Sequence, residues 1–145
     1  MKPPTRRWEQ CAAQGYSLFV YGTLQFPEVL EVLIDRVPRR RAATASGWRV
    51  AALPGLLYPG LVPQLNARAR GLVLSGLTAA EWEILDAFED DQYDLRAISL
   101  AAAADRVSTY VWTAAVAQDD WCPEHFTATH LPDFVTQCAE WRRGF

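Results

Sequence analysis

The sequence predicts a single α+β domain, and its length, composition and order of segments support this. The 145 residues suit one domain and leave little room for a second. Half of them are apolar and 21% are charged, a composition typical of a folded globular protein. Strand-like and helix-like segments are mixed without the regular order of a doubly wound sheet. We expect residues 17–145 to form this domain and residues 1–16 to form a flexible leader.

The first half of the expected domain contains two strands with a helix between them. An apolar run rich in strand-forming residues occupies residues 17–21 and ends at Gly22. Pro27 suits the first position of a helix, because its missing N–H needs no partner there, and apolar residues follow at helical spacing. A second strand is expected at residues 42–53, bent near its glycine. Three prolines and two glycines indicate a loop at residues 54–63.

The next helix has a recognisable N-terminal signal. Residues 69–77 form an apolar, strand-like segment that leads into it. Thr78 and Glu81 follow at capping-box spacing, at which each side chain can accept the backbone N–H of the other residue. The helix that begins here is expected to end near Glu89, which places this carboxylate at a helix terminus.

The last part of the chain is expected to contain two strands and a helical tail. Residues 93–100 and 107–113 have strand-like patterns, and an alanine-rich link at residues 101–105 joins them. Apolar and aromatic residues occur at alternate positions of the second strand, so both of its faces can be partly buried. Residues 123–142 have helical character, and Pro132 predicts a break or a second helix start within them.

Charge and cysteine content exclude several classes of protein. The net charge of −3 argues against a nucleic-acid-binding protein, which needs a basic face, and the one basic run, at residues 39–41, is expected to be a solvated loop. No segment has the apolar length of a membrane span or the pattern of a targeting peptide. Cys11, Cys122 and Cys138 match no metal or disulfide spacing and are expected to be reduced thiols. We therefore expect a cytoplasmic protein with no nucleic-acid or membrane partner.

The first candidate site is the turn Tyr21-Gly22-Thr23-Leu24, which follows the first strand. A glycine at this point lets the backbone bend sharply and approach a ligand closely. If a helix starts directly after it, the unpaired N–H groups of that helix form a site for an anion such as a carboxylate. A tight connection without any ligand explains the same residues, so both interpretations stay open.

The second candidate site is the acidic run at residues 86–91, which places four carboxylates at a helix end. This charge opposes the helix dipole, and sequences tend to break such local rules at functional sites. Phe88 and Tyr93 flank Glu89, and burial by such neighbours would raise the pKa of its carboxyl group toward the range of a general base. A solvated acidic turn and a metal site are the alternatives, although the run lacks the ligand spacing of a calcium loop.

Several segments occur in an order that resembles one known family. The matching pieces are residues 18–24, Tyr58-Pro59-Gly60, residues 85–89, Tyr93 with Arg96, and the tail segments 121–126, 130–131 and 134–135 with Cys138. In this order and at this spacing they resemble the γ-glutamylcyclotransferase-like family, which includes the AIG2-like proteins of plants and bacteria. The likeness extends over residues 17 to about 142.

The resemblance implies a fold, a reaction and a set of site residues. The fold would be a small mixed β-barrel with a few flanking helices and a pocket at one end. The reaction would cleave a small-molecule γ-glutamyl amide into 5-oxoproline and a free amine, without a metal or a cofactor. Glu89 would be the catalytic acid/base residue. We expect Asp90 and Asp91 beside it to be solvated. The residues that bind the substrate would be Tyr21, Gly22, Thr23, Leu24, Tyr58 and Tyr93.

Two other functions fit the same motifs. One is a non-catalytic protein that binds a small carboxylate or amine in the same pocket. The other is a related enzyme that transfers amides or cleaves isopeptides with the same glutamate. The presence of Glu89 favours the two enzymes over the binding protein. The amine side of the substrate and the oligomeric state stay open.

Overall fold

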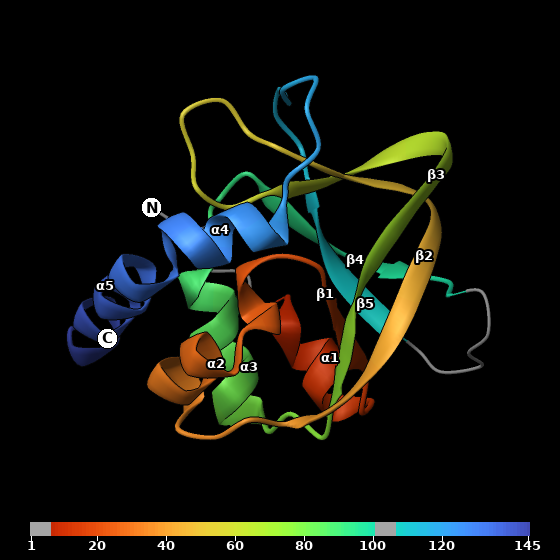
Figure 1. The fold of residues 1–145 in the computed structure, drawn as a ribbon. Helices are drawn as coiled ribbons and strands as arrows, with labels where there is room; N and C mark the ends of the chain where they lie inside the picture. The colour runs from red at the N-terminus through yellow and green to blue at the C-terminus, as the bar shows by residue number, and fades with distance from the viewer. Residues whose placement is uncertain (1–6, 101–106) are drawn as a thin grey trace.

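The computed structural model describes residues 7–100 and 107–145, and a five-stranded sheet forms its centre (Figure 1). The strands are β1 (Ser17–Val20), β2 (Arg39–Ala51), β3 (Gly60–Ser75), β4 (Tyr93–Ile98) and β5 (Val107–Trp112). Their order in the sheet is β2-β3-β1-β5-β4, with β1 and β5 parallel and the pairs β1–β3, β2–β3 and β4–β5 antiparallel. The link predicted at residues 101–105 lies outside the described residues.

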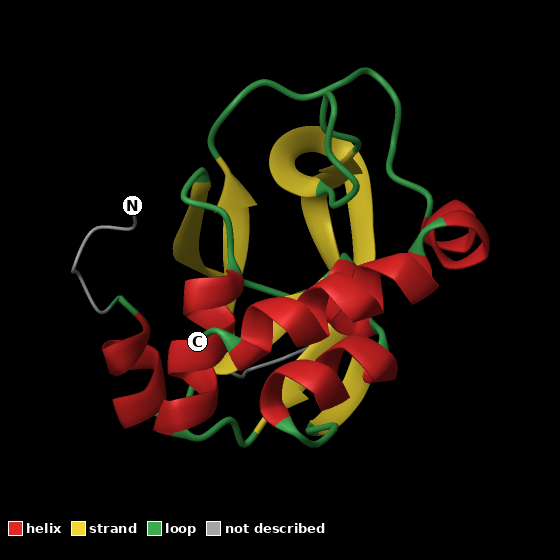
Figure 2. Ribbon diagram, turned by 90° about the vertical axis from the view of Figure 1, so that its left-hand side faces the viewer, coloured by secondary structure: helices red, strands yellow, loops and turns green. Residues whose placement is uncertain are grey.

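The helices gather on one side of this sheet, as the two ribbon views show (Figures 1 and 2). They are α1 (Trp8–Ala13), the 3₁₀ turn η1 (Thr23–Gln25), α2 (Pro27–Ile34), α3 (Ala79–Phe88), α4 (Pro123–Thr129) and α5 (Leu131–Arg143). Pro132 lies in the first turn of α5, so the predicted break in the helical tail is confirmed. The mixed sheet and its helices confirm the predicted α+β class.

The sheet does not close into the predicted barrel. β3 makes an additional parallel pairing with β5 through Leu61 and Val111. The edge strands β2 and β4 are not paired with each other in the described part of the chain, so the sheet is open there. The basic run at residues 39–41 begins edge strand β2 instead of forming a loop, and its arginines are exposed. Exposed cations along an edge strand disfavour pairing with another strand.

Side-chain alternation along β1 divides the core into two layers. Leu18 and Val20 pack with the helices, in a cluster that includes Trp82. Phe19 and Tyr21 belong to a second cluster, formed with residues of β2, β3 and β5. Successive side chains of a strand point to opposite faces, which is why this short run serves both layers. The turn that follows β1 is therefore fixed from both sides of the sheet.

Part of the segment expected to be a flexible leader is folded against the domain. Helix α1 lies within this segment, and Cys11 in it is buried. The Cys11 Sγ is 3.5 Å from the Ser108 Oγ of β5. The flexible leader predicted at residues 1–16 is therefore corrected for the helical part, while residues 1–6 lie outside the described residues.

Strand β3 begins inside the segment that was predicted to be a loop, residues 54–63. Pro63 lies opposite Trp48 of β2, next to a shift in register between Ser46 and Trp48. Gly47 at this shift has a φ of 85°, which a residue with a side chain rarely adopts, and the predicted bend at this glycine is confirmed. Because the ladder is already interrupted here, a proline without an N–H is tolerated within the strand.

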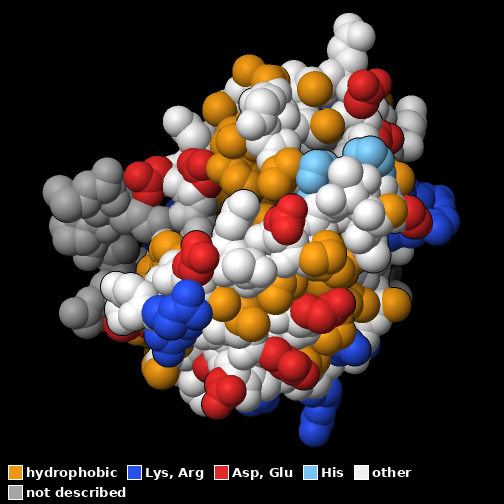
Figure 3. Space-filling model, turned by 60° about the vertical axis from the view of Figure 1, so that its left-hand side comes forward, with side chains coloured by type: hydrophobic (Ala, Val, Ile, Leu, Met, Phe, Trp, Pro, Cys, Tyr) orange, Lys and Arg blue, Asp and Glu red, His pale blue; other side chains and the backbone are white. Residues whose placement is uncertain are grey.

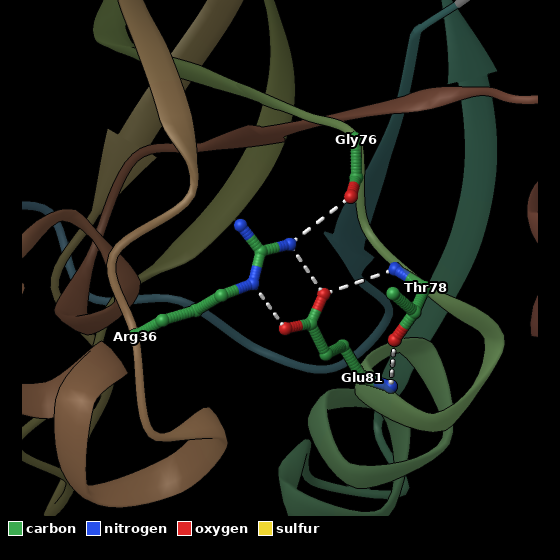
Figure 4. Close-up of polar contacts among 4 residues, drawn as sticks. All are labelled: Arg36, Gly76, Thr78 and Glu81. Atoms are coloured by element: carbon green, nitrogen blue, oxygen red, sulfur yellow. Dashed lines mark hydrogen bonds and ion pairs between the residues drawn. The ribbon is translucent and has the colours of Figure 1, made fainter.

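The predicted capping box at the start of α3 is present and is strengthened by an arginine. The Thr78 Oγ1 accepts the Glu81 N–H at 3.1 Å, and the Glu81 Oε1 accepts the Thr78 N–H at 2.9 Å (Figure 4). Arg36, just after α2, donates to the same carboxylate at 2.6 Å and to the Gly76 carbonyl at 3.0 Å. The hydrogen bond from Arg36 is the main cause that lowers the pKa of Glu81.

Replacing Arg36 should therefore reduce stability at neutral pH more than at acid pH. Because the pKa of Glu81 is lowered by folding, the stabilisation is complete above the ordinary carboxyl pKa and is lost as the pH falls through the lowered value. We expect Arg36→Met to lower the free energy of unfolding by up to about 1 kcal/mol near neutral pH, as for other partly exposed ion pairs. Urea unfolding of both proteins at neutral and acid pH measures this, and a difference that grows toward acid pH would contradict it.

Candidate active site

A cavity of about 330 Å³ lies where the end of β1, the loop before β3, the end of α3 and helix α5 meet. This volume is at the lower end of the range of small-molecule sites. All residues that the sequence suggested for the site line this one cavity: Glu89, Tyr21, Gly22, Thr23, Leu24, Tyr58 and Tyr93. Two motifs that are far apart in the chain therefore contribute to the same pocket.

At Gly22 the turn after β1 packs closely against Pro59, and both line the cavity. A β-carbon added at Gly22 would be 2.7 Å from the Pro59 Cγ, closer than real β-carbons come to other atoms. This position therefore has no room for a side chain. The Gly22 carbonyl accepts the Gln25 N–H at 3.1 Å, which starts the short turn η1. The glycine thus allows the turn after β1 to pack directly on the Tyr58-Pro59 loop.

Glu89 is the first residue after α3, and its side chain is half-buried at the cavity. Its N–H donates to the carbonyls of Leu85 and Asp86, both at 3.3 Å, so the helical bonding ends at this residue. With a ψ of 144° the backbone of Glu89 leaves the helix. Burial raises the pKa of nearby tyrosine hydroxyls, and the Glu89 charge raises it further in Tyr21, Tyr58, Tyr93 and Tyr110. The Glu89 carboxylate is therefore close enough to interact electrostatically with the hydroxyl groups of these four tyrosines.

The hydroxyl groups of the deepest tyrosines are held by backbone carbonyls. The Tyr21 hydroxyl donates to the Tyr110 carbonyl at 2.5 Å. The Tyr93 hydroxyl donates to the Pro59 carbonyl at 2.5 Å. Because their raised pKa values keep these groups protonated at neutral pH, they supply hydrogen bonds and not bases. The carboxylates are left as the bases of the cavity.

The acidic run is not simply a solvated turn. Asp86 is buried, and its Oδ1 accepts the Tyr110 hydroxyl at 2.8 Å. Asp90 lines the cavity and accepts the Tyr58 hydroxyl at 2.6 Å, so its prediction as a solvated neighbour was wrong. Asp91 is exposed. A helix-end carboxylate can be held by hydroxyls from distant strands and loops, which the local sequence does not reveal.

The aromatic wall of the cavity was not predicted. The Phe88 ring centroid is 5.2 Å from that of Trp141 and 6.3 Å from that of Phe134. Gln137 and Cys138 complete this wall, and burial raises the pKa of the Cys138 thiol to about 12. The α5 residues of the wall recur at the spacing of one helix face, which is the signal that could have revealed it.

The cavity contains negative but no positive side chains. None of the described residues that line it is lysine, arginine or histidine, whereas two acidic residues, Glu89 and Asp90, line it. A carboxylate ligand in this cavity would depend on backbone N–H groups, such as those of the turn after Gly22. In the described parts of the chain, no three His, Cys, Asp or Glu side chains are close enough to hold a metal ion. The metal interpretation of the acidic run therefore finds no ligand set there.

Apart from Cys138, none of the histidines and cysteines of the described residues lines the cavity. His125 and His130 lie side by side on the surface, with ring centroids 5.7 Å apart (Figure 3). The three cysteines carry free thiols, as expected.

None of the helices in the described ranges has the length and apolar character that a membrane crossing requires.

Comparison with known proteins identifies the family. Residues 18–127 match the family model of γ-glutamyl cyclotransferases, AIG2-like. The chain belongs to this family. AIG2-like protein C of Arabidopsis thaliana is 38% identical over 129 residues, which cover 84% of this chain and 75% of that protein. AIG2-like protein A of the same plant is 33% identical and covers 84% of this chain and 78% of its own length. The resemblance found in the sequence is thus confirmed.

Solved structures of family members have the same fold. One Arabidopsis thaliana protein, known from a solution structure, is 32% identical with a TM-score of 0.64, and 86% of this chain and 88% of that chain are covered. A second protein of the same plant, also known from a solution structure, is 27% identical with a TM-score of 0.66, and 90% of this chain and 85% of that chain are covered. The family model ends at residue 127, so helix α5 lies beyond it. The part of the cavity wall that α5 supplies is therefore outside the residues that match the family model.

Proposed function

We propose that this protein is a γ-glutamylcyclotransferase that converts a γ-glutamyl amide into 5-oxoproline and a free amine, with Glu89 as acid and base. One observation carries the proposal: Glu89 and the turn after Gly22, 65 or more residues apart in the chain, line the same cavity. Membership of the family supports the same reaction class. The competing interpretation is a protein that binds such a compound without cleaving it.

The proposed chemistry needs one carboxylate and a folded substrate. Glu89 takes a proton from the substrate's α-ammonium group, and the resulting amine attacks the γ-carbonyl carbon of the same molecule. The new C–N bond closes the five-membered ring, and the original amide C–N bond breaks as Glu89 gives its proton to the departing nitrogen. The ring nitrogen releases its remaining extra proton to the free amine, so the products are 5-oxoproline and the protonated amine. Because the attack is intramolecular, holding the glutamyl chain in a bent shape supplies much of the acceleration. Backbone N–H groups of the turn at residues 22–24 would bind the α-carboxylate.

The leaving half of the substrate would lie against the aromatic wall. Phe88, Phe134 and Trp141 offer apolar contact there, and Glu89 and Asp90 are the charged side chains of the cavity. A second carboxylate on the substrate would meet like charge without a cationic partner, which costs several kcal/mol in such sites. We therefore expect the leaving amine to carry an apolar group and no carboxylate.

A matched pair of substrates tests this proposal. γ-Glutamyl-phenethylamide and γ-glutamyl-phenylalanine differ only in the carboxylate of the leaving amine, and 5-oxoproline release is measured for both, with glutathione as a third compound. We expect kcat/KM to be at least ~10-fold higher for the phenethylamide. Equal values would contradict the choice of amine but not the reaction. No 5-oxoproline from any of the three, together with measurable binding, would favour the non-catalytic protein.

A further inference from the structure

Arg7 joins the two ends of the segment that carries Glu89. This residue lies just before α1, outside the region that matches the family model. Its Nε donates to the Asp86 Oδ1 at 2.7 Å, and its Nη1 donates to the Tyr93 carbonyl at 2.8 Å. Asp86 belongs to the last turn of α3, and Tyr93 begins β4, so one guanidinium group spans the turn between them.

The same contacts continue to the cavity. The Asp86 side chain is only 10% exposed and also accepts the Tyr110 hydroxyl, and Tyr110 lines the cavity. The Arg7 guanidinium lies over the Tyr110 ring, 5.3 Å from its centroid. The Asp86 carbonyl accepts the Glu89 N–H at 3.3 Å. Arg7 is thus connected to Glu89 through Asp86 at the end of α3, and to the tyrosine hydroxyl groups of the cavity through Tyr110.

We propose that Arg7 is a positioning residue of the candidate active site, which fixes the turn at residues 86–93 and so holds the Glu89 carboxylate at the cavity. A buried carboxylate such as Asp86 depends strongly on its cationic partner. The planar guanidinium can bind the Asp86 carboxylate and the Tyr93 carbonyl at once, which the single ammonium group of lysine does less well. The activity part of this inference rests on the proposed function, whereas its structural part does not.

A second ion pair of the same helix provides a matched control. Arg36 holds Glu81 in the first turn of α3, also across a long distance in the chain (Figure 4). Neither Arg36 nor Glu81 lines the cavity. Removing the Arg36 guanidinium therefore takes an ion pair from the same helix without touching the turn that carries Glu89.

The experiment compares Arg7→Met, Arg7→Lys and Arg36→Met with the parent. Turnover is followed as 5-oxoproline release, and amide hydrogen exchange at Glu89 and Tyr93 is followed by NMR without substrate. For Arg7→Met we expect kcat to fall by ~10-fold or more with KM changed by less than about 2-fold, because positioning acts on the chemical step. Exchange at both amides should be ~10-fold faster, since their local structure opens more easily. The kcat and the exchange rates of Arg7→Lys should lie between those of Arg7→Met and the parent. Arg36→Met should match the parent in kcat and in exchange at these amides.

Each other outcome has a defined meaning. Equal losses of kcat in Arg7→Met and Arg36→Met would show that Arg7 contributes only general stability, and the inference would fail. Parental exchange at Glu89 and Tyr93 in Arg7→Met would also overturn it. If Arg7→Met does not fold, Arg7→Lys decides, because parental kcat and exchange in that variant would show that the bridge is not needed. If the parent turns over no γ-glutamyl compound, the proposed function fails, and the exchange comparison still tests the role of Arg7.

Discussion

Replacing Glu89 by glutamine is expected to lower 5-oxoproline release by ~10²–10⁴-fold, the usual contribution of general acid–base catalysis. The amide of Glu89→Gln is almost the same size as the carboxylate but cannot take up a proton at neutral pH. Substrate affinity should change much less, because the proposed carboxylate contacts come from the backbone of residues 22–24. The fold should persist, since the change removes one negative charge from the end of α3, where the helix dipole disfavours it.

The neighbouring aspartates serve as graded controls for this prediction. Asp91 is exposed, so Asp91→Asn should retain most of the parental turnover. Asp90→Asn should cause an intermediate loss, because Asp90 lines the cavity and holds the Tyr58 hydroxyl. Steady-state assays of the three variants decide between the possibilities. Parental turnover in Glu89→Gln would exclude the proposed mechanism, and equal losses in all three would indicate a general effect of the acidic charge.

Gly22→Ala should have the second largest effect on activity. The added methyl group would come within 2.7 Å of the Pro59 ring, which is not a flexible side-chain end that can simply turn away. The turn after β1 and the Tyr58-Pro59 loop would have to separate, and both are walls of the cavity. Displacements of about 1 Å in a catalytic site can lower rates by ~10²-fold, so we expect kcat/KM to fall by about this factor.

Gly144→Ala is the matched control for the added methyl group. At Gly144 a β-carbon would be 3.6 Å from the Trp141 carbonyl, an ordinary contact at the end of α5. We expect this variant to have the activity and melting temperature of the parent. If Gly22→Ala is also fully active, the close packing of the two walls is not required for the reaction.

The sequence predicts the local structure of this chain better than its long-range contacts. The strand before Gly22, the helix after Pro27 and the capping box at Thr78 follow from short patterns, and the structure confirms them. The early start of β3 was not predicted, because a proline usually indicates a loop. Pro63 is accepted in this strand only because the pairing with β2 shifts register next to it. Arg7 was assigned to a flexible leader, since nothing in its neighbourhood indicates a buried partner 79 residues away.

In the candidate site, too, the sequence predicts local features better than long-range contacts. Its two motifs could be brought together only through the spacing of a known family, because no local pattern places Glu89 next to Gly22. The binding of Asp90 by Tyr58 has no local signal either. The aromatic wall did have one, since Phe134, Cys138 and Trp141 recur at helical spacing. Helical spacing alone does not indicate a pocket, because an apolar helix face has the same pattern over a core as over a cavity.

Helix α5 lines the cavity as an element separate from the turns that carry Gly22 and Glu89. It packs beside α2, where the Arg142 Nε donates to the Leu33 carbonyl at 2.8 Å, and it contributes no residue to the sheet or to the turn that carries Glu89. Its cavity-lining residues are Phe134, Gln137, Cys138 and Trp141, all on one helix face. If the leaving group lies against this face, as proposed, mutations here would reshape its space without replacing Glu89 or the turn after Gly22. Under the proposed function, changes in the tail of the chain would therefore alter the choice of amine while Glu89 and Gly22 are kept.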